Sequence, residues 1–321
     1  MRQQDFEKKY GEVWLALEQL LARKPFNDDA IELPGLYRQV SHHLSLAKSR
    51  RYTFSLVSHL NHLVSECHHK YYQGSTLYRY QFMRFLFIEF PAALRRNKLY
   101  VLASLSIFLL PALIMWGLCF INPDMIYTIM EPAQVVEFEN MYEPGQEKFG
   151  RERSSDTDIA MFGYYIQHNI GIAFQTFAGG LLFGVGAVFY LLFNGLQLGG
   201  VAGHIAQVGY GQTFYSFVIG HGAFELTAIV YAGAAGLRIG LALIAPGNFR
   251  RFDALRLAAK DAVLIVYGAI LMLVIAAFLE AFWSSSSTLT PSIKYAVGAL
   301  FWLLVIAYSC LMGRGARQHG Y

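Results

Sequence analysis

The stretch NGLQLGGVAGHIAQVGYGQTFYSFVIGHGAFE, residues 194–225, is apolar and rich in glycine, yet it carries His204, His221 and Glu225 and has no Lys or Arg. A carboxylate in the centre of a bilayer is costly, so it has to face the protein interior and find a partner or a proton there. The stretch therefore predicts a membrane-embedded helical bundle whose interior is partly polar.

The composition of the whole chain supports a membrane protein. Hydrophobic residues make up 55% of the 321 residues, and the mean hydropathy is +0.35, which is high for a soluble protein of this length. A span needs about 20 apolar helical residues. The stretches that meet this requirement are residues 99–121, 170–193, 262–282 and 293–312, and residues 213–237 also qualify if the membrane tolerates His221 and Glu225.

Charge distribution predicts the topology. Basic residues immediately precede the first span and recur in residues 238–261, which by the positive-inside tendency places both segments in the cytoplasm. Residues 122–168 contain nine acidic and three basic residues and are expected to form an extracytoplasmic loop. An even number of crossings then has to lie between Asn194 and Arg238. Residues 195–211 would have to supply one of them, although 17 residues reach only about 25 Å.

We therefore expect an all-α, polytopic membrane helical bundle with five full spans plus one short or re-entrant helix, and with both termini cytoplasmic. Residues 99–321 form this transmembrane domain. Residues 1–98 show helical periodicity and predict a cytoplasmic, amphipathic helical domain. His59, His62 and Cys67 of this domain offer metal-ligating groups, but their spacing does not match a known ligand pattern and favours solvated helix faces.

Glycines spaced four apart are typical of closely packed membrane helices. Such packing is expected within one chain or between copies of it, so a homo-oligomer is one prediction. The glycines assigned to helix packing are Gly180, Gly184, Gly195, Gly199, Gly203, Gly220 and Gly222.

Several polar residues are candidates for a functional role inside the bundle. His221 and Glu225 are four residues apart and share a helix face, as do Gln197 and His204, which are seven apart. The pair His221 and Glu225 would hold a proton, ligate a cation or simply link two helices, and the last is the commonest use of such pairs. The other candidates are Asn194, and His168 and Asn169 at the outer mouth of the second span, whereas Glu280 is expected at the interface.

The residues indicate no enzyme. A nucleophile with a base at suitable spacing is missing, and His221, Gly222 and Glu225 form HGxxE, which lacks the second histidine of a zinc protease helix. We therefore expect no catalytic residues, no metal, no cofactor and no nucleic-acid partner.

Several segments together resemble the stage II sporulation protein M family of multi-pass membrane proteins. They are LYRQVSHHLSLAKSR (36–50), LVSHLNHLVSECHHKYY (56–72), HNIGIAFQTFAGGLLFGVG (168–186), FNGLQLGG (193–200) and GHGAFELTAI (220–229). The resemblance implies an integral protein of the bacterial inner membrane, which in spore formers anchors an envelope complex holding peptidoglycan-cleaving enzymes. It implies no cofactor. The N-terminal domain and the long outer loop depart from the short sporulation form.

These observations lead to two expected functions. The first is a scaffold or anchor in contact with membrane lipids and with envelope or peptidoglycan-remodelling proteins. The alternative is a transporter or channel in which His221 and Glu225 line a polar path.

Overall fold

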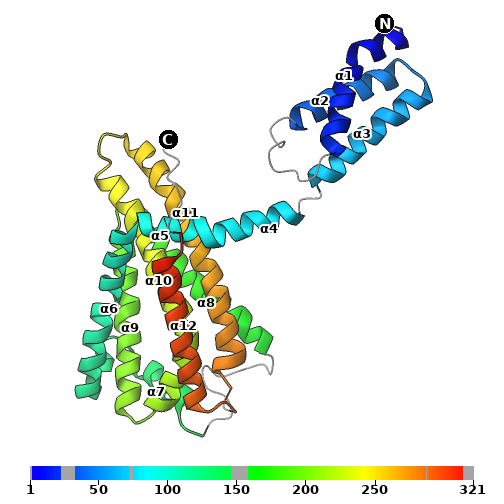
Figure 1. The fold of residues 1–321 in the computed structure, drawn as a ribbon. Coiled ribbons are helices and arrows are strands. Elements are labelled where there is room, and N and C mark those ends of the chain that lie inside the picture. Colours follow the sequence, from blue (N-terminus) through cyan, green and yellow to red (C-terminus); the bar gives the residue numbers. More distant parts are fainter. Residues whose placement is uncertain (1, 23–32, 73–74, 146–157, 287, 314–321) are drawn as a thin grey trace. The chain divides into compact units, whose positions relative to one another are not determined.

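The chain folds into helices arranged in two compact units, Met1–Phe82 and Met83–Tyr321 (Figure 1). The computed structural model describes residues 2–22, 33–72, 75–145, 158–286 and 288–313. The sequence indicates a boundary at residue 98, whereas the structure assigns residues 83–98 to the second unit. The reason is packing, because Phe90, Ala93 and Leu94 are buried in the main core of that unit.

The first unit is a bundle of three amphipathic helices, α1 (Gln3–Ala22), α2 (Leu33–Ser49) and α3 (Phe54–Tyr72), with α4 (Ser75–Arg84) after them. Their apolar faces form a core of their own around Phe6, Leu17 and Leu60. Cys67 is fully buried in this core, whereas His59 and His62 are exposed. The three groups considered as metal ligands are therefore not brought together, since the thiol packs inward and the imidazoles face outward.

The second unit is the membrane bundle, and the prediction of an all-α polytopic fold is confirmed. Five of its helices are long and apolar enough to cross a membrane: Lys98–Ile121, Val185–Gln207, Gly211–Ile244, Arg251–Ser284 and Pro291–Leu311. In chain order its elements are η2 (Phe85–Glu89), α5 (Phe90–Arg96), α6 (Lys98–Ile121), η3 (Pro123–Thr128), α7 (Pro132–Tyr142), α8 (Asp158–Ala178), η4 (Gly179–Leu181), α9 (Val185–Gln207), α10 (Gly211–Ile244), α11 (Arg251–Leu279), η5 (Glu280–Ser284) and α12 (Pro291–Leu311).

The predicted span 170–193 is wrong as a single helix. Helix α8 ends at Ala178, and the chain turns through Phe183 and Gly184, whose φ angles are +54° and +81°, before α9 begins at Val185. This turn passes close to α10, because a Cβ on Gly240 of α10 would lie 2.4 Å from the Cα atom of Gly184. Residues 195–207 are consequently the second half of a full-length helix, and a short crossing is not needed.

The predicted loop 122–168 is largely helical where it is described. Its first part forms η3 and α7, whose residues Ile126, Val135 and Tyr142 share a buried core with Ile205 and Phe214 of the bundle. Its last part belongs to α8, which begins at Asp158. Residues 123–142 thus form a cap packed against α9 and α10, while residues 146–157 lie outside the described residues.

Helices α6 and α9 touch backbone to backbone along a row of glycines. A Cβ added to Gly195, Gly199 or Gly203 would lie 2.3, 2.0 or 2.3 Å from a carbonyl oxygen of α6, at distances that no real Cβ adopts. Gly220 packs instead against a side chain, and a Cβ there would lie 2.4 Å from the Trp283 ring. Gly222 differs, since a Cβ there would meet only side chains of its own helix.

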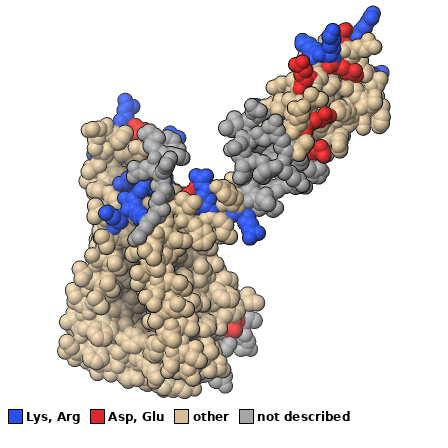
Figure 2. All heavy atoms as spheres, in the orientation of Figure 1, with Lys and Arg blue, Asp and Glu red and all other residues tan. Residues whose placement is uncertain are grey.

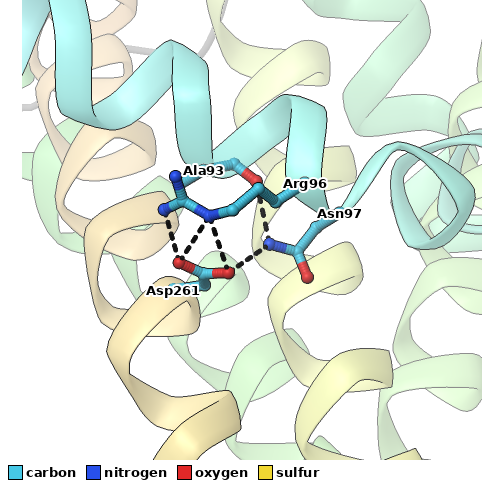
Figure 3. Close-up of polar contacts among 4 residues, drawn as sticks. All are labelled: Ala93, Arg96, Asn97 and Asp261. Carbon is cyan, nitrogen blue, oxygen red and sulfur yellow. Dashed lines mark hydrogen bonds and ion pairs between the residues drawn. The ribbon is translucent and has the colours of Figure 1, made fainter. Parts of the chain in front are cut away.

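Lys and Arg side chains gather at one end of the membrane unit, around α5 and the turn between α10 and α11 (Figure 2). One of these, Arg96, donates hydrogen bonds to both carboxylate oxygens of Asp261 on α11, the shortest from Nη2 at 2.6 Å (Figure 3). Asn97, which is 1% exposed, donates to Asp261 Oδ2 and to the carbonyl oxygen of Ala93. This bidentate ion pair fixes the start of α6 against α11.

Candidate functional site: a polar cavity in the membrane bundle

A cavity of about 420 Å³ lies between the cap and the interior of the bundle. One face of α10 lines it from Phe214 to Ile229, a rise of about 22 Å at 1.5 Å per residue. Its rim includes Gln134 and Glu137 of the cap, both exposed. The cavity therefore reaches from the cap to the middle of the 34-residue helix α10.

The structure brings most of the predicted polar residues to this one place. His168 of α8, Asn194 and Gln197 of α9, and His221 and Glu225 of α10 all line the cavity, as does Gly222. His168 lies in the middle of α8 rather than at the mouth of a span, because α8 begins ten residues before it, at Asp158. Five side chains from three helices thus surround one polar space.

At the inner part of the cavity, three groups capable of binding a cation converge. His221 Nε2 lies 3.9 Å from Glu225 Oε2, and one oxygen of Glu280 lies within 4.8 Å of each of those groups. His221 is buried and both carboxylates are half-buried. Glu280 was expected at the interface, so its place beside His221 corrects that expectation.

The imidazole of His221 is hydrogen-bonded to η5, on the side of the ring away from Glu225. Its Nδ1 lies 2.9 Å from the Ser284 hydroxyl, and Lys294 Nζ donates to the Ser284 carbonyl oxygen at 2.7 Å. Lys294 is 1% exposed, so its amino group lies inside the bundle. In the tautomer that carries its proton on Nδ1, His221 donates to the Ser284 hydroxyl oxygen and the Nε2 lone pair faces Glu225.

Two predicted residues lie elsewhere. His204 Nε2 is 2.7 Å from Glu139 Oε1, so this pair links α9 to the cap and does not line the cavity. Asn169 is 2% exposed, and its amide nitrogen has no hydrogen-bond partner among the described residues. Neither residue adds to the polar cavity.

The cavity ends within the bundle. Beyond Ile229, the face of α10 carries Gly233, Gly236 and Gly240, and a Cβ on any of them would lie 2.4 to 2.9 Å from atoms of α6, α8, α9 or the turn between α8 and α9. Contacts this close, with side chains at Gly233 and with backbone at Gly236 and Gly240, leave no room for a polar route along this face. In the described part of the chain the cavity is closed on the side of the basic residues.

Two family models match the chain. One, described as stage II sporulation protein M, covers residues 104–285, which is more than half of the sequence. The chain belongs to the stage II sporulation protein M family. The other, a domain of unknown function (DUF8413), covers residues 4–73 and so corresponds to the three-helix bundle of the first unit. No curated protein and no solved structure matches the chain.

The stage II sporulation protein M match runs from α6 to η5 and contains the entire set His221, Glu225, Glu280 and Ser284. Helix α12, with Lys294, lies outside the matched residues. The polar cavity thus lies in the part of the chain that the family model matches, whereas Lys294 lies on a helix outside the matched residues.

Sequence reasoning missed three residues of the site. Glu280 and Ser284 lie on η5, a π-helical turn at the end of α11, and the periodicity of an α-helix does not predict where such a turn directs its side chains. Lys294 had a visible signal, because it is a charged residue inside the apolar stretch 293–312.

Proposed function

We propose that this family member is an anchor in the bacterial cytoplasmic membrane, connecting its N-terminal helical unit to partners in the cell envelope. The observation that carries the proposal is the closure of the bundle, in which glycine backbones meet and the polar cavity ends halfway. A bundle that is packed closed across half of its length suits a protein that holds others in place better than an open channel.

The orientation follows from charge. Arg95, Arg96, Arg250 and Arg251 lie at one end of the bundle, and residues 122–145 at the other end contain acidic residues but no Lys or Arg. The positive-inside tendency supports a cytoplasmic location for the basic end and for both termini. The cap would then face the cell envelope, where peptidoglycan-remodelling proteins are the partners that the family suggests.

A photo-crosslinking experiment tests the anchor. A photoreactive amino acid replaces Val136, which is 53% exposed on the cap helix α7, and as a matched control it replaces Leu303, which is 67% exposed on the apolar helix α12. We expect Val136 to yield a discrete adduct with an envelope protein in native membranes, and Leu303 to yield lipid adducts. Lipid adducts or no adduct at both positions would contradict the proposal.

The glycine spacing does not support self-association in the way that the sequence suggested. The spaced glycines are used in contacts within one chain, so they do not argue for contacts between copies. The exposed apolar residues of α6 and α12 are suited to lipid. A homo-oligomer stays a prediction, to be tested by the mass of the purified protein in detergent.

A second candidate function, transport, is favoured by the depth of the cavity. Transporters hold substrate near the middle of the membrane and are closed to one side in each state. If the cavity is a substrate site, Glu225→Gln should abolish an ion- or proton-dependent flux in liposomes, while Glu137→Gln at the rim should retain it. Absence of flux through the unmodified protein would leave the anchor as the function.

A further inference from the structure

The side chains of His221, Glu225 and Glu280 lie together in the cavity. A simple link between two helices would not need all three of them. The hydrogen bond from His221 to Ser284 already joins α10 to η5. Two carboxyl groups are added to that link, from α10 and from η5, and both approach the free face of the imidazole. Like charges at this distance repel strongly in a low-dielectric interior, and a cation between them removes the repulsion.

The backbone is built to bring these groups together. Helix α11 changes to the π-helical turn η5 at Glu280, and Glu280 and Ser284 both reach His221 from this turn. Isolated π-helical turns are uncommon and occur often at functional sites. The turn is an observation independent of the side-chain cluster, and it points to the same place.

The surroundings of the imidazole resemble the outer shell of a metal ligand. A metal-bound histidine usually gives its other ring N–H to a fixed acceptor, which orients the ring. Ser284 is fully buried and is suited to be that acceptor, and Lys294 in turn holds the Ser284 carbonyl oxygen. His221 Nε2 is thereby directed toward Glu225 and the cavity.

We propose that His221 Nε2, Glu225 and Glu280 bind one Zn²⁺ ion, with a fourth coordination position facing the cavity. Imidazole and carboxylate are both good Zn²⁺ ligands, and two carboxylates neutralise the charge of the ion in the bundle. Tetrahedral ligands about 2.1 Å from Zn²⁺ lie roughly 3.4 Å apart. The observed separations of 3.9 Å and at most 4.8 Å require only rotation of the two half-buried glutamate side chains.

This inference goes beyond the anchor role, and it holds whether the chain anchors or transports. The open position would accept water or an anionic or polar ligand that enters past Glu137 and Gln134. The site lies wholly within residues 104–285, the part matched by the family model.

The test is Zn²⁺ titration of the full-length protein in detergent after treatment with a chelator. The protein carries His59→Gln and His62→Gln, so that these exposed imidazoles, which line a surface pocket of the first unit together with Glu18, contribute no adventitious Zn²⁺ binding. We expect one Zn²⁺ per chain. Glu225→Gln and Glu280→Gln should each weaken the affinity by about tenfold or more, while Glu137→Gln, a carboxylate at the rim of the same cavity, should leave it unchanged.

Two further measurements separate a metal site from a structural link. Co²⁺ bound to the same protein should give the absorption of a tetrahedral ion, and His221→Gln should remove it. Ser284→Ala should weaken the affinity by about tenfold without changing the stoichiometry, as expected for a positioning residue.

The proposal is overturned if the folded, monodisperse protein binds no Zn²⁺, or if Glu225→Gln and Glu280→Gln bind Zn²⁺ as tightly as the protein that carries neither substitution. If either Gln variant fails to fold, Glu225→Asp and Glu280→Asp retain the charge but withdraw the carboxylate by one methylene. An unchanged affinity in both Asp variants would likewise overturn it.

Discussion

At the residue scale, the polar side chains buried in this protein are held by specific partners. In the first unit, Trp14 Nε1 donates to Nδ1 of His43 at 3.1 Å, and His43 is 5% exposed. Burial, with a smaller contribution from His42, lowers the pKa of His43 below its ordinary value. The neutral imidazole is thus the form that the folded unit requires, because only this form accepts the proton of Trp14.

This pairing predicts a pH-dependent stability of the first unit. Since the pKa of His43 is lower in the folded than in the unfolded state, the unfolded state binds more protons, and the free energy of unfolding decreases as the pH falls below about 6.5. The protection of α1 to α3 in the full-length protein, meaning the observed exchange rate relative to the base-catalysed intrinsic rate at the same pH, should therefore be lower at pH 5.5 than at pH 7.5. His43→Gln should reduce this difference in protection, and the exposed control His62→Gln should retain it. Equal protection of the unmodified protein at both pH values would contradict the prediction.

At the element scale, glycine decides which helices meet. The sequence predicted close packing from glycines four apart, and the row Gly195, Gly199 and Gly203 indeed lies against α6. The partner helix was not predictable, because spacing gives the face of one helix and says nothing of the helix opposite. Gly222 shows that glycine in the sequence does not by itself predict a helix contact. It flanks His221 as Gly220 does, but it lines the cavity, whereas Gly220 packs against Trp283.

The α6 contact predicts a large effect of a single methyl group. Gly199→Ala would place a Cβ 2.0 Å from the carbonyl oxygen of Ala112, and backbone cannot move aside as a flexible side chain can. We expect a loss of about 1 to 3 kcal/mol of stability, seen as a lower unfolding temperature in detergent. Gly117→Ala is the matched control, since a Cβ at Gly117 meets nothing within 4 Å, and it should be neutral or slightly stabilising. Equal effects of the two substitutions would refute this account.

At the scale of the whole molecule, the sequence identified the class of fold and the family but not the division of the apolar stretches into helices. Residues 170–193 form one uninterrupted apolar run, and hydropathy does not reveal a turn made by Phe183 and Gly184. The first half of α8 was assigned to the outer loop because the acidic excess of residues 122–168 was applied to the whole segment, although residues 158–168 (DIAMFGYYIQH) are largely apolar. The structure brings most of the predicted polar residues to one cavity. The position of Glu280 beside His221 was not predicted, because the periodicity of an α-helix does not give side-chain directions in a π-helical turn.

The orientation of the membrane unit is the whole-molecule prediction. In a background with Cys310→Ser, which removes the exposed native thiol, Arg250→Cys should react with a membrane-impermeant reagent only after the cell membrane is opened, whereas Glu143→Cys should react in intact cells. Cys67 and Cys119 are buried and should not react. Labelling of Arg250→Cys in intact cells would reverse the proposed orientation.

The depth of the cavity has an electrical consequence. When solution fills the cavity, it extends the potential of its own side of the membrane inward toward Glu225, and the transmembrane voltage would then fall mainly across the glycine-packed half of the bundle that remains. The local field in that half would be stronger than the field across an unbroken bilayer of the same voltage. A charge displaced through that thinner layer would sense nearly the whole potential, about 2.3 kcal/mol per elementary charge at 100 mV, while moving only part of the membrane thickness.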